Sequence, residues 1–168
     1  YTEEGHEVAL GRALGERLGV VVEFVALPRE AFANALADGG VDAVLTRVAA
    51  PVTAGAGATV TTATGYHSGI AAAMRTDTPV RHWQDLAGKT VCLSRAHDRA
   101  AALARQLGAR VDVHDTPAQA LVQLRLGHCD AALHDQAQLD ALFQRPEWRK
   151  FSATLAAVAP ADLVLVTD

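Results

Sequence analysis

Hydrophobic positions along the chain follow two alternating patterns, a helical repeat of three to four residues and short β-branched runs. From Glu7 to Leu18 the apolar residues recur on one helical face, and Gly19 follows as a stop signal. The run Val20–Val25 predicts a buried strand. The next predicted elements are a helix from Pro28 to Gly39 and a strand over residues 41–46.

Beyond this point the alternation is interrupted and then resumes. Residues 49–65 are rich in Gly, Ala and Thr without charge, which is typical of a loop followed by an extended segment. The predicted strands are Gly69–Arg75, Thr90–Ser94, Val111–His114, Cys129–His134 and Leu163–Val166, and the predicted helices are 83–86, Asp98–Leu107, one that follows Thr116 with Pro117 in its first turn, and Gln136–Phe143. Such alternation predicts right-handed βαβ crossovers and a parallel sheet.

One short motif occurs twice. Residues 40–47 read GVDAVLTR and residues 128–135 read HCDAALHD, and the identical residues keep a constant offset of 88 positions. The repeat predicts two copies of one helix–strand unit, which end differently, in Arg47 and in Asp135. Ligands of a parallel sheet bind outside the carboxyl ends of its strands. Arg47, Arg95 and Asp135 are all expected just beyond such ends.

Composition narrows the range of functions. Half of the 168 residues are hydrophobic and 20 % are charged, which favours a packed domain over disorder. The net charge of −4 gives no reason to expect a nucleic acid or an anionic membrane as partner. The two cysteines are too far apart for a CxxC motif, and the seven histidines form no HExxH motif. The sequence therefore predicts no metal site, no cofactor and no catalytic group.

Five segments, in a fixed order, carry a resemblance to a known family. They read GHEVALGRALGERLGVVVEFV from residue 5, VDAVLTR from residue 41, TGYHSGIAAAMRTDTPV from residue 64, WQDLAGKTVCLS from residue 83 and GHCDAALHD from residue 127. In this order they resemble the family 3 extracellular solute-binding proteins, the amino-acid-binding receptors of ABC importers. The resemblance covers roughly residues 5–168. It implies an α/β fold with two Rossmann-like lobes, the periplasmic-binding-protein type II clamshell, which closes on a ligand.

The same resemblance implies where the lobes lie. Lobe 1 is expected over residues 1–72, lobe 2 over 73–162, and the second crossover between them over 163–168. The first strand and the C-terminal helix of the family fold are missing from this chain, and it contains no signal peptide. The implied protein is a monomer in the periplasm or another extracytoplasmic space. Its implied partners are an amino acid or a similar small polar solute and the membrane permease of an ABC transporter.

Cys92 and Cys129 stand where some members of the family carry a pair of bonded cysteines, so the resemblance implies a disulfide. The strands that hold them are the first and third of lobe 2, which are neighbours in the doubly wound order, and a bridge is geometrically allowed. Two buried free thiols are the alternative.

The implied ligand residues lie on both lobes. Asp135 stands where the family keeps its ammonium-binding aspartate; its alternative role is the N-cap of helix 136–143. The family's carboxylate-binding arginine is absent, because residues 48–74 contain no Arg or Lys and Ala49 replaces a small hydroxyl residue. Arg47, with its neighbour Thr46, is the candidate replacement. The alternative for Arg47 is a solvated surface side chain.

A second departure affects the helix N-terminus of lobe 2, where the family's Gly-Thr-Thr is replaced by Ala96-His97-Asp98. His97 and Asp98 are therefore candidate ligand contacts, although Asp98 is also expected to act as the N-cap and repel a carboxylate. Arg29 stands where many members place an aromatic or apolar wall against the ligand. It is otherwise an exposed residue of a first helical turn.

Three functions remain open from the sequence. The first is a receptor that delivers a small solute to an importer. The second is a ligand-sensing domain of a membrane signalling protein, in which the altered pocket regulates a signal. The third is a dehydratase-like enzyme on the same scaffold, which would need an acid or base from His97, Asp98 or Asp135. No triad or metal spacing supports the enzyme, so the sequence favours a binding protein.

Overall fold

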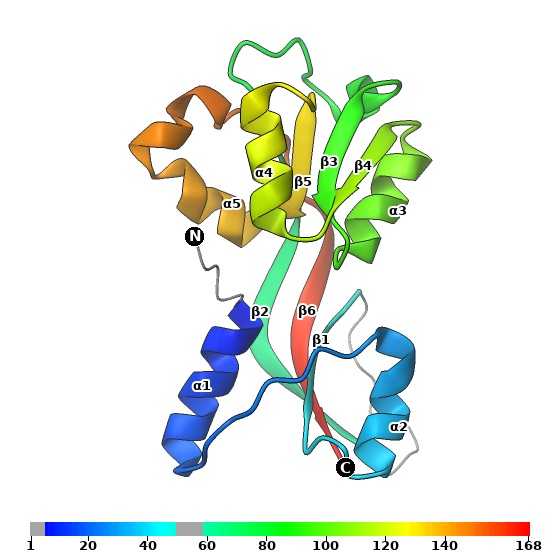
Figure 1. Ribbon diagram of the computed structural model, residues 1–168, viewed down its shortest axis with the longest axis vertical. Helices are drawn as coiled ribbons and strands as arrows, with labels where there is room; N and C mark the ends of the chain where they lie inside the picture. Colours follow the sequence, from blue (N-terminus) through cyan, green and yellow to red (C-terminus); the bar gives the residue numbers. More distant parts are fainter. Residues whose placement is uncertain (1–5, 50–58) are drawn as a thin grey trace. The chain divides into compact units, whose positions relative to one another are not determined.

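The computed structural model describes residues 6–49 and 59–168. Its contacts divide the chain into two units (Figure 1). Unit 1 consists of residues 1–67 and 161–168, and unit 2 consists of residues 68–160. The strands β2 and β6 each contribute residues to both units. Residues 50–58, which form most of the Gly/Ala/Thr-rich stretch, lie outside the described part of the chain.

The predicted mixture of helices and strands is confirmed. The elements are α1 (His6–Leu18), η1 (Arg29–Ala31), α2 (Phe32–Ala37), β1 (Val44–Val48), β2 (Val60–Ala73), η2 (Trp83–Leu86), β3 (Thr90–Ser94), α3 (Asp98–Gln106), β4 (Arg110–His114), α4 (Pro117–Leu126), β5 (Ala131–Asp135), α5 (Gln136–Phe143), η3 (Pro146–Phe151) and β6 (Val158–Thr167). The strand order is β1-β6-β2-β5-β3-β4. No helix in the described ranges combines the length and the apolar character needed to cross a membrane.

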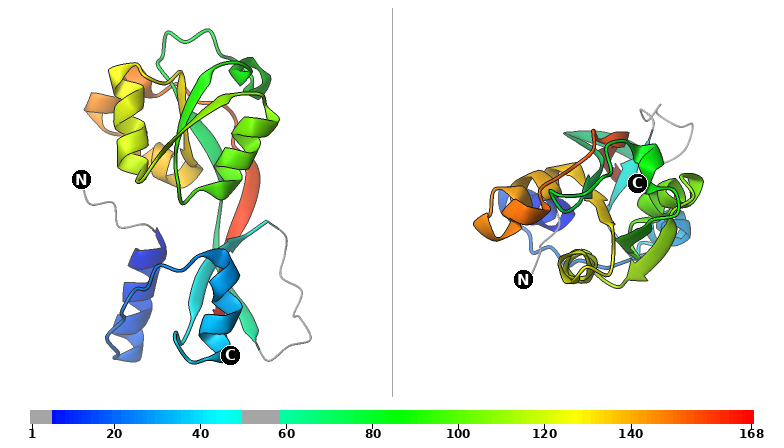
Figure 2. Two further views of the ribbon diagram at one scale, coloured as in Figure 1. Left: turned by 45° about the vertical axis from the view of Figure 1, so that its right-hand side comes forward. Right: turned by 90° about the horizontal axis from the view of Figure 1, so that it is seen from above.

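Unit 2 is a three-layer α/β arrangement. Strands β3, β4 and β5 pair in parallel, and β2 joins β5 in antiparallel orientation. Alternate side chains of the strands enter two separate cores: Val91 and Leu93 pack with α3 on one face, and Cys92 packs with α4 and α5 on the other. Figure 2 (left) shows α3 and α4 on opposite sides of this sheet. Both faces are thus covered, as expected for parallel strands.

Local sequence signals explain where α4 begins and ends. The hydroxyl of Thr116 accepts the backbone N–H of Gln119, the side chain of Gln119 accepts the backbone N–H of Thr116, and Pro117 occupies the first turn. Gly127 ends the helix with a left-handed φ of 80°, which glycine adopts without steric cost. The cap and the first-turn proline predicted from the sequence are both present.

In the described part of unit 1, β1 and β6 form an antiparallel pair, with Val44 opposite Val166, and α1 contacts β1. The helix α1 carries Gly11 where the ring of Phe24 approaches. A Cβ at Gly11 would lie only 2.7 Å from that ring, so glycine is what allows Phe24 to approach the helix. This contact holds residues 20–25 near α1 without forming a strand.

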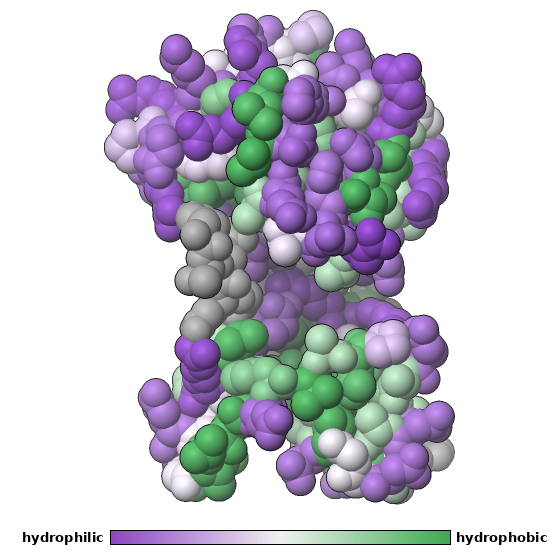
Figure 3. Space-filling view, in the orientation of Figure 1, coloured by the Kyte–Doolittle hydropathy of each residue, from purple (hydrophilic) through white to green (hydrophobic). Residues whose placement is uncertain are grey.

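The strand predicted over Val20–Val25 is wrong: these residues have no strand pairing. Val21 is 99 % exposed and Val25 is 56 % exposed, so the run is not buried. A strand exists only when its backbone bonds to a neighbour, and β1 is paired with β6 rather than with this run. Figure 3 shows the resulting hydrophobic surface on unit 1, whereas unit 2 presents mostly hydrophilic side chains in that view.

Several predicted boundaries shift. The strand predicted as Gly69–Arg75 begins earlier and ends two residues earlier, in β2 (Val60–Ala73), and Leu163–Val166 is part of the longer strand β6. Arg47 lies inside β1, one residue before its end, and Asp135 is the last residue of β5. Arg95 directly follows β3, as expected.

Candidate functional site

The carboxyl ends of β3 and β5 define the candidate site of unit 2. Of these two parallel strands, β5 leads directly into the N-terminus of α5, and β3 leads through residues 95–97 into that of α3. Helix N-termini present unpaired N–H groups and a partial positive charge. Parallel α/β sheets bind ligands at this edge. The residues that follow the two strands are therefore the ones whose geometry matters.

Asp135 is the buried carboxylate of this edge. It is 5 % exposed, and its Oδ1 accepts the backbone N–H groups of Ala137 at 3.1 Å and Gln138 at 3.3 Å. The N-cap geometry predicted as an alternative is thus present. The buried hydroxyl of Ser68 accepts the same Ala137 N–H at 3.3 Å. Binding of a ligand ammonium by Asp135 stays a prediction.

Two histidines stand near these helix N-termini: His97 precedes α3, and His134 directly precedes Asp135 in β5. The rings of His97 and His134 meet edge to face with centroids 6.1 Å apart, and His134 is 8 % exposed. Nε2 of His134 hydrogen-bonds Oε1 of Gln138. Nδ1 of His97 accepts the backbone N–H of Ala100 at 3.3 Å, so in the neutral ring the proton resides on Nε2. The pair places two imidazole groups at this edge of the sheet.

The structure corrects the role of Asp98. The N-cap of α3 is His97, and Asp98 is the first residue of the helix. The chain turns into the helix one residue earlier than expected, because the ring nitrogen of His97 satisfies the N–H of Ala100. Asp98 still adds a negative charge to the first turn, where the helix dipole favours it.

In unit 1, Arg47 is the cation of interest. Its Nε lies 3.0 Å from Oε1 of Glu7 on α1, and its guanidinium carbon lies 5.6 Å from the centre of the Tyr66 ring. The Arg47 side chain is 19 % exposed, so it is packed and not the solvated side chain of the alternative interpretation. Thr46 precedes it in β1, opposite Val164 of β6 and partly buried.

Arg29 lies in the 3₁₀ turn η1, and its Nη2 donates to the backbone carbonyl of Arg47 at 2.8 Å. This hydrogen bond connects the turn after Pro28 to β1. Arg29 therefore has a structural contact, and its predicted place in a ligand wall stays a prediction.

Sequence reasoning missed five residues of these sites: Glu7, Tyr66, Ser68, His134 and Gln138. Only His134 had a usable signal, because it directly precedes Asp135 at a strand end. Gln138 lies in the first turn of α5, and Glu7, Tyr66 and Ser68 come from segments remote in sequence from the residues they contact. Ser68, for example, reaches α5 because β2 pairs with β5.

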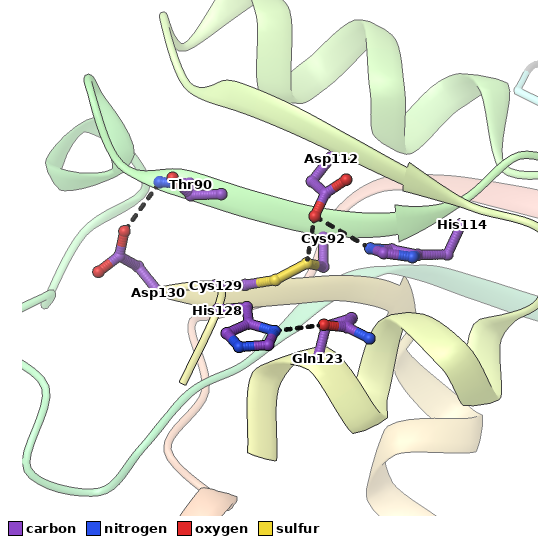
Figure 4. The surroundings of a disulfide bond; sticks show 8 residues. All are labelled: Thr90, Cys92, Asp112, His114, Gln123, His128, Cys129 and Asp130. Carbon is purple, nitrogen blue, oxygen red and sulfur yellow. Dashed lines mark hydrogen bonds and ion pairs between the residues drawn. A yellow bond between two sulfur atoms is a disulfide. The ribbon is translucent and has the colours of Figure 1, made fainter. Parts of the chain in front are cut away.

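The predicted disulfide between Cys92 and Cys129 is present (Figure 4). The strands β3 and β5 are neighbours, with Cys92 opposite Ala132, and the two Cα atoms are 5.9 Å apart. A reciprocal contact lies beside it: Asp130 Oδ2 accepts the backbone N–H of Thr90 at 2.8 Å, and the Thr90 carbonyl accepts the N–H of Asp130.

No protein-family model matches the chain, and no curated protein matches its sequence. Solved structures match nearly all of it. The GluR0 ligand-binding core in complex with L-glutamate has a TM-score of 0.74 and 22 % identity, and the match covers 96 % of this chain and 75 % of that one. The substrate-binding protein of an amino acid ABC transporter has a TM-score of 0.68 and 20 % identity, and the match covers 100 % of this chain and 78 % of that one. A double mutant of the VFT2 domain of BvgS from Bordetella pertussis has a TM-score of 0.64 and 22 % identity, and the match covers 96 % of this chain and 70 % of that one.

The fold is that of the type II periplasmic binding proteins. A periplasmic-binding-protein fold is what the sequence resemblance implied, and these neighbours are consistent with the family 3 solute-binding proteins. Two of the named neighbours are a ligand-binding core and a substrate-binding protein. Asp135 is the buried carboxylate of unit 2 and Arg47 is the packed cation of unit 1, and contact of either with a ligand stays a prediction.

Proposed function

We propose that this protein is an extracytoplasmic solute-binding protein that binds an amino acid or a similar small polar solute for an ABC importer. The observation that carries the proposal is the buried carboxylate of Asp135 at the carboxyl end of β5. A carboxylate at 5 % exposure is costly unless it is compensated. Two backbone N–H groups compensate Oδ1, and a ligand ammonium is a natural further partner.

Arg47 is proposed as the partner of the ligand carboxylate. Its planar guanidinium presents five N–H donors, so it can serve Glu7 through Nε and a second carboxylate as well. The ring of Tyr66 limits the orientation of the guanidinium. A pre-oriented cation loses less side-chain entropy when a carboxylate binds.

The extracytoplasmic location rests on the disulfide. Cysteine pairs bonded in this way persist in oxidising compartments and are rare in the cytosol. The likeness to the substrate-binding protein of an amino acid ABC transporter supports the proposed delivery to a membrane permease. In this role the protein is expected to act as a monomer.

A thermal-shift screen of the full-length protein tests the proposal. The panel consists of L-amino acids, polyamines and small carboxylic acids. A true ligand at about 100 times its dissociation constant adds about 2.7 kcal/mol to the free energy of unfolding. Failure of every L-amino acid to raise the melting temperature would contradict an amino-acid receptor.

Matched variants test the two residues. Asp135→Asn and Arg47→Ala should each abolish the ligand-induced shift. The controls are Asp140→Asn on the exposed side of α5 and Arg17→Ala on the exposed side of α1, which should leave the shift unchanged. Normal binding by both site variants would show that neither residue contacts the ligand.

A sensory domain is the second candidate, favoured by the likeness to the VFT2 domain of BvgS. In that case the ligand-binding unit belongs to a membrane signalling protein. The reading frame of the whole gene separates the two roles. A membrane-spanning segment followed by a signalling domain would replace the importer role with the sensory one.

A further inference from the structure

The surroundings of the disulfide contain an unusual set of side chains. Strand β4 pairs in parallel with β3, which places Asp112 beside Cys92 and His114 beside Ser94. Residues two apart on a strand point to the same face, so Asp112 and His114 both lie on the face that carries the Cys92 sulfur. Figure 4 shows the carboxylate, the imidazole and the disulfide converging.

The distances within this group are short. Oδ2 of Asp112 lies 3.7 Å from Sγ of Cys92 and 3.1 Å from Nε2 of His114. One potential ligand atom from each of the three residues lies within 4.8 Å of the others, the only such group in the described part of the chain. Ligand atoms of a tetrahedral zinc site are about 3.3–3.8 Å apart, given metal–ligand distances of about 2.0–2.3 Å. The observed spacing is close to this range.

The disulfide prevents metal binding in the oxidised protein. A metal is bound by a thiolate, and a bonded sulfur carries no such charge. Only Asp112 and His114 then remain as ligands, fewer than the four of a structural zinc site. Reduction would release two sulfurs at once, those of Cys92 and Cys129, whose Cα atoms are held 5.9 Å apart by neighbouring strands.

We propose that reduction of the Cys92–Cys129 disulfide creates a binding site for one Zn²⁺ ion, with Asp112 and His114 as the other two ligands. The donor set, two thiolates, one imidazole and one carboxylate, is one that zinc accepts. The disulfide and the metal are then alternative crosslinks between β3 and the start of β5. The side chain of Asp112 is 48 % exposed, so a metal ion can reach the site from the solvent beside this residue.

The chemical steps balance as follows. A phosphine reductant donates two electrons to the S–S bond, and water supplies the oxygen of the resulting phosphine oxide and the two protons of the new thiols. Zn²⁺ then displaces both thiol protons to the solvent as it binds the two thiolates. The affinity for metal is therefore expected to fall as the pH is lowered, since protons compete for the sulfurs.

Titration of the reduced full-length protein with Co²⁺ and then Zn²⁺ tests the proposal. Co²⁺ bound to thiolates gives a charge-transfer absorption, and tetrahedral coordination gives strong visible bands. One equivalent of Co²⁺ should produce both signals, and one equivalent of Zn²⁺ should remove them. The oxidised protein should show neither. Absence of the signals from the reduced protein, or equal binding by the oxidised protein, would overturn the proposal.

Variants distinguish the proposed four-ligand site from metal binding by the two thiols alone. Asp112→Asn and His114→Gln leave both cysteines in place and should weaken Zn²⁺ binding by about 10- to 100-fold or more. His128→Gln is the matched control, because this exposed imidazole adjoins Cys129 but bonds to Gln123. Wild-type affinity in both site variants would contradict the assignment. Loss of folded structure on reduction, seen by circular dichroism, would contradict it too, since the site requires the pairing of β3 with β4.

Discussion

The two copies of the repeated motif have different environments. In unit 2 the copy forms β5, which is buried at all five positions and lies between β2 and β3. In unit 1 it forms β1, which is buried only at Val44 and has β6 as its strand partner. Two segments that share three of eight residues thus form the same local element in both places. Its burial depends on which other strands and helices pack against it.

Helix coverage explains the difference. Strand β5 has α4 and α5 on one face and the α3 side of the sheet on the other, so both of its faces are removed from water. The described neighbours of β1 are fewer, and the apolar run Val20–Val25 stays exposed instead of joining it. The repeated motif therefore favours a strand in both units, whereas the burial that stabilises the strand comes from the helices and strands packed against it.

The largest expected effect concerns the disulfide, which has no counterpart in unit 1. Replacing both Cys92 and Cys129 by serine should lower the free energy of unfolding of unit 2 by about 3–4 kcal/mol, because the bridge closes a long loop. Both tryptophans, Trp83 and Trp148, belong to unit 2, so their fluorescence during urea unfolding reports on it. An unchanged transition midpoint would contradict the expectation, and a reductant should not destabilise the double variant further.

The next effect compares one pair of equivalent positions in the repeat. Leu133 in β5 is 2 % exposed, whereas Leu45 in β1 is only partly buried. Leu133→Ala should cost about 3 kcal/mol through lost burial and a cavity. Leu45→Ala should cost about 1 kcal/mol, since less apolar area is removed from water. Urea unfolding followed by circular dichroism measures both, and equal losses would show that the two strands are equally packed.

A smaller effect is expected at the last matched pair, Asp135 and Arg47, in the absence of ligand. Asp135→Ala removes the cap of α5 and should cost about 1–2 kcal/mol. Arg47→Ala breaks a partly exposed ion pair with Glu7 and should cost less than about 1 kcal/mol. Asp135→Asn is the control, because asparagine also caps helices well. A larger loss of unfolding free energy for Arg47→Ala than for Asp135→Ala would contradict this order.

The smallest expected effect is a pH dependence of the stability of unit 2, which contains Asp85. Backbone N–H groups of Arg81 and His82 donate to the carboxylate of Asp85 and hold its pKa below its ordinary value of 3.8. A lowered folded-state pKa stabilises the fold above the unfolded pKa, and this contribution is lost as the pH falls through the folded pKa. An NMR titration of the Asp85 carboxyl should show a midpoint below 3.8. Asp85→Asn should remove the corresponding part of the acid sensitivity.

Much of unit 2 could be predicted from the sequence. Strand β3 and helix α5 have the predicted bounds, and the capping residues Thr116 and Pro117 begin α4. These predictions succeed because caps, stop residues and apolar periodicity act over a few residues. The pairing of Cys92 with Cys129 followed from a family resemblance together with the expected order of strands.

The candidate site was less predictable. Asp135 lies at a strand end, as the repeat suggested, but its neighbour Ser68 could not be found, because it belongs to another strand, β2. The cap of α3 was assigned one residue too late, to Asp98, because a histidine ring in the cap position is an uncommon choice. Likewise, the ion pair between Arg47 and Glu7 joins residues far apart along the chain.

The sequence by itself determined much of the alternation of helices and strands, the two copies of the motif and the ends of a few elements such as β3 and α5. Only the tertiary structure decided that the Val20–Val25 run stays unpaired, that β5 is buried on both faces, and that Asp112 and His114 adjoin the disulfide. The physical reason is the range of the interactions. Helix caps and turns are satisfied within a few residues, whereas strand pairing and side-chain clusters depend on segments that meet only when the chain folds.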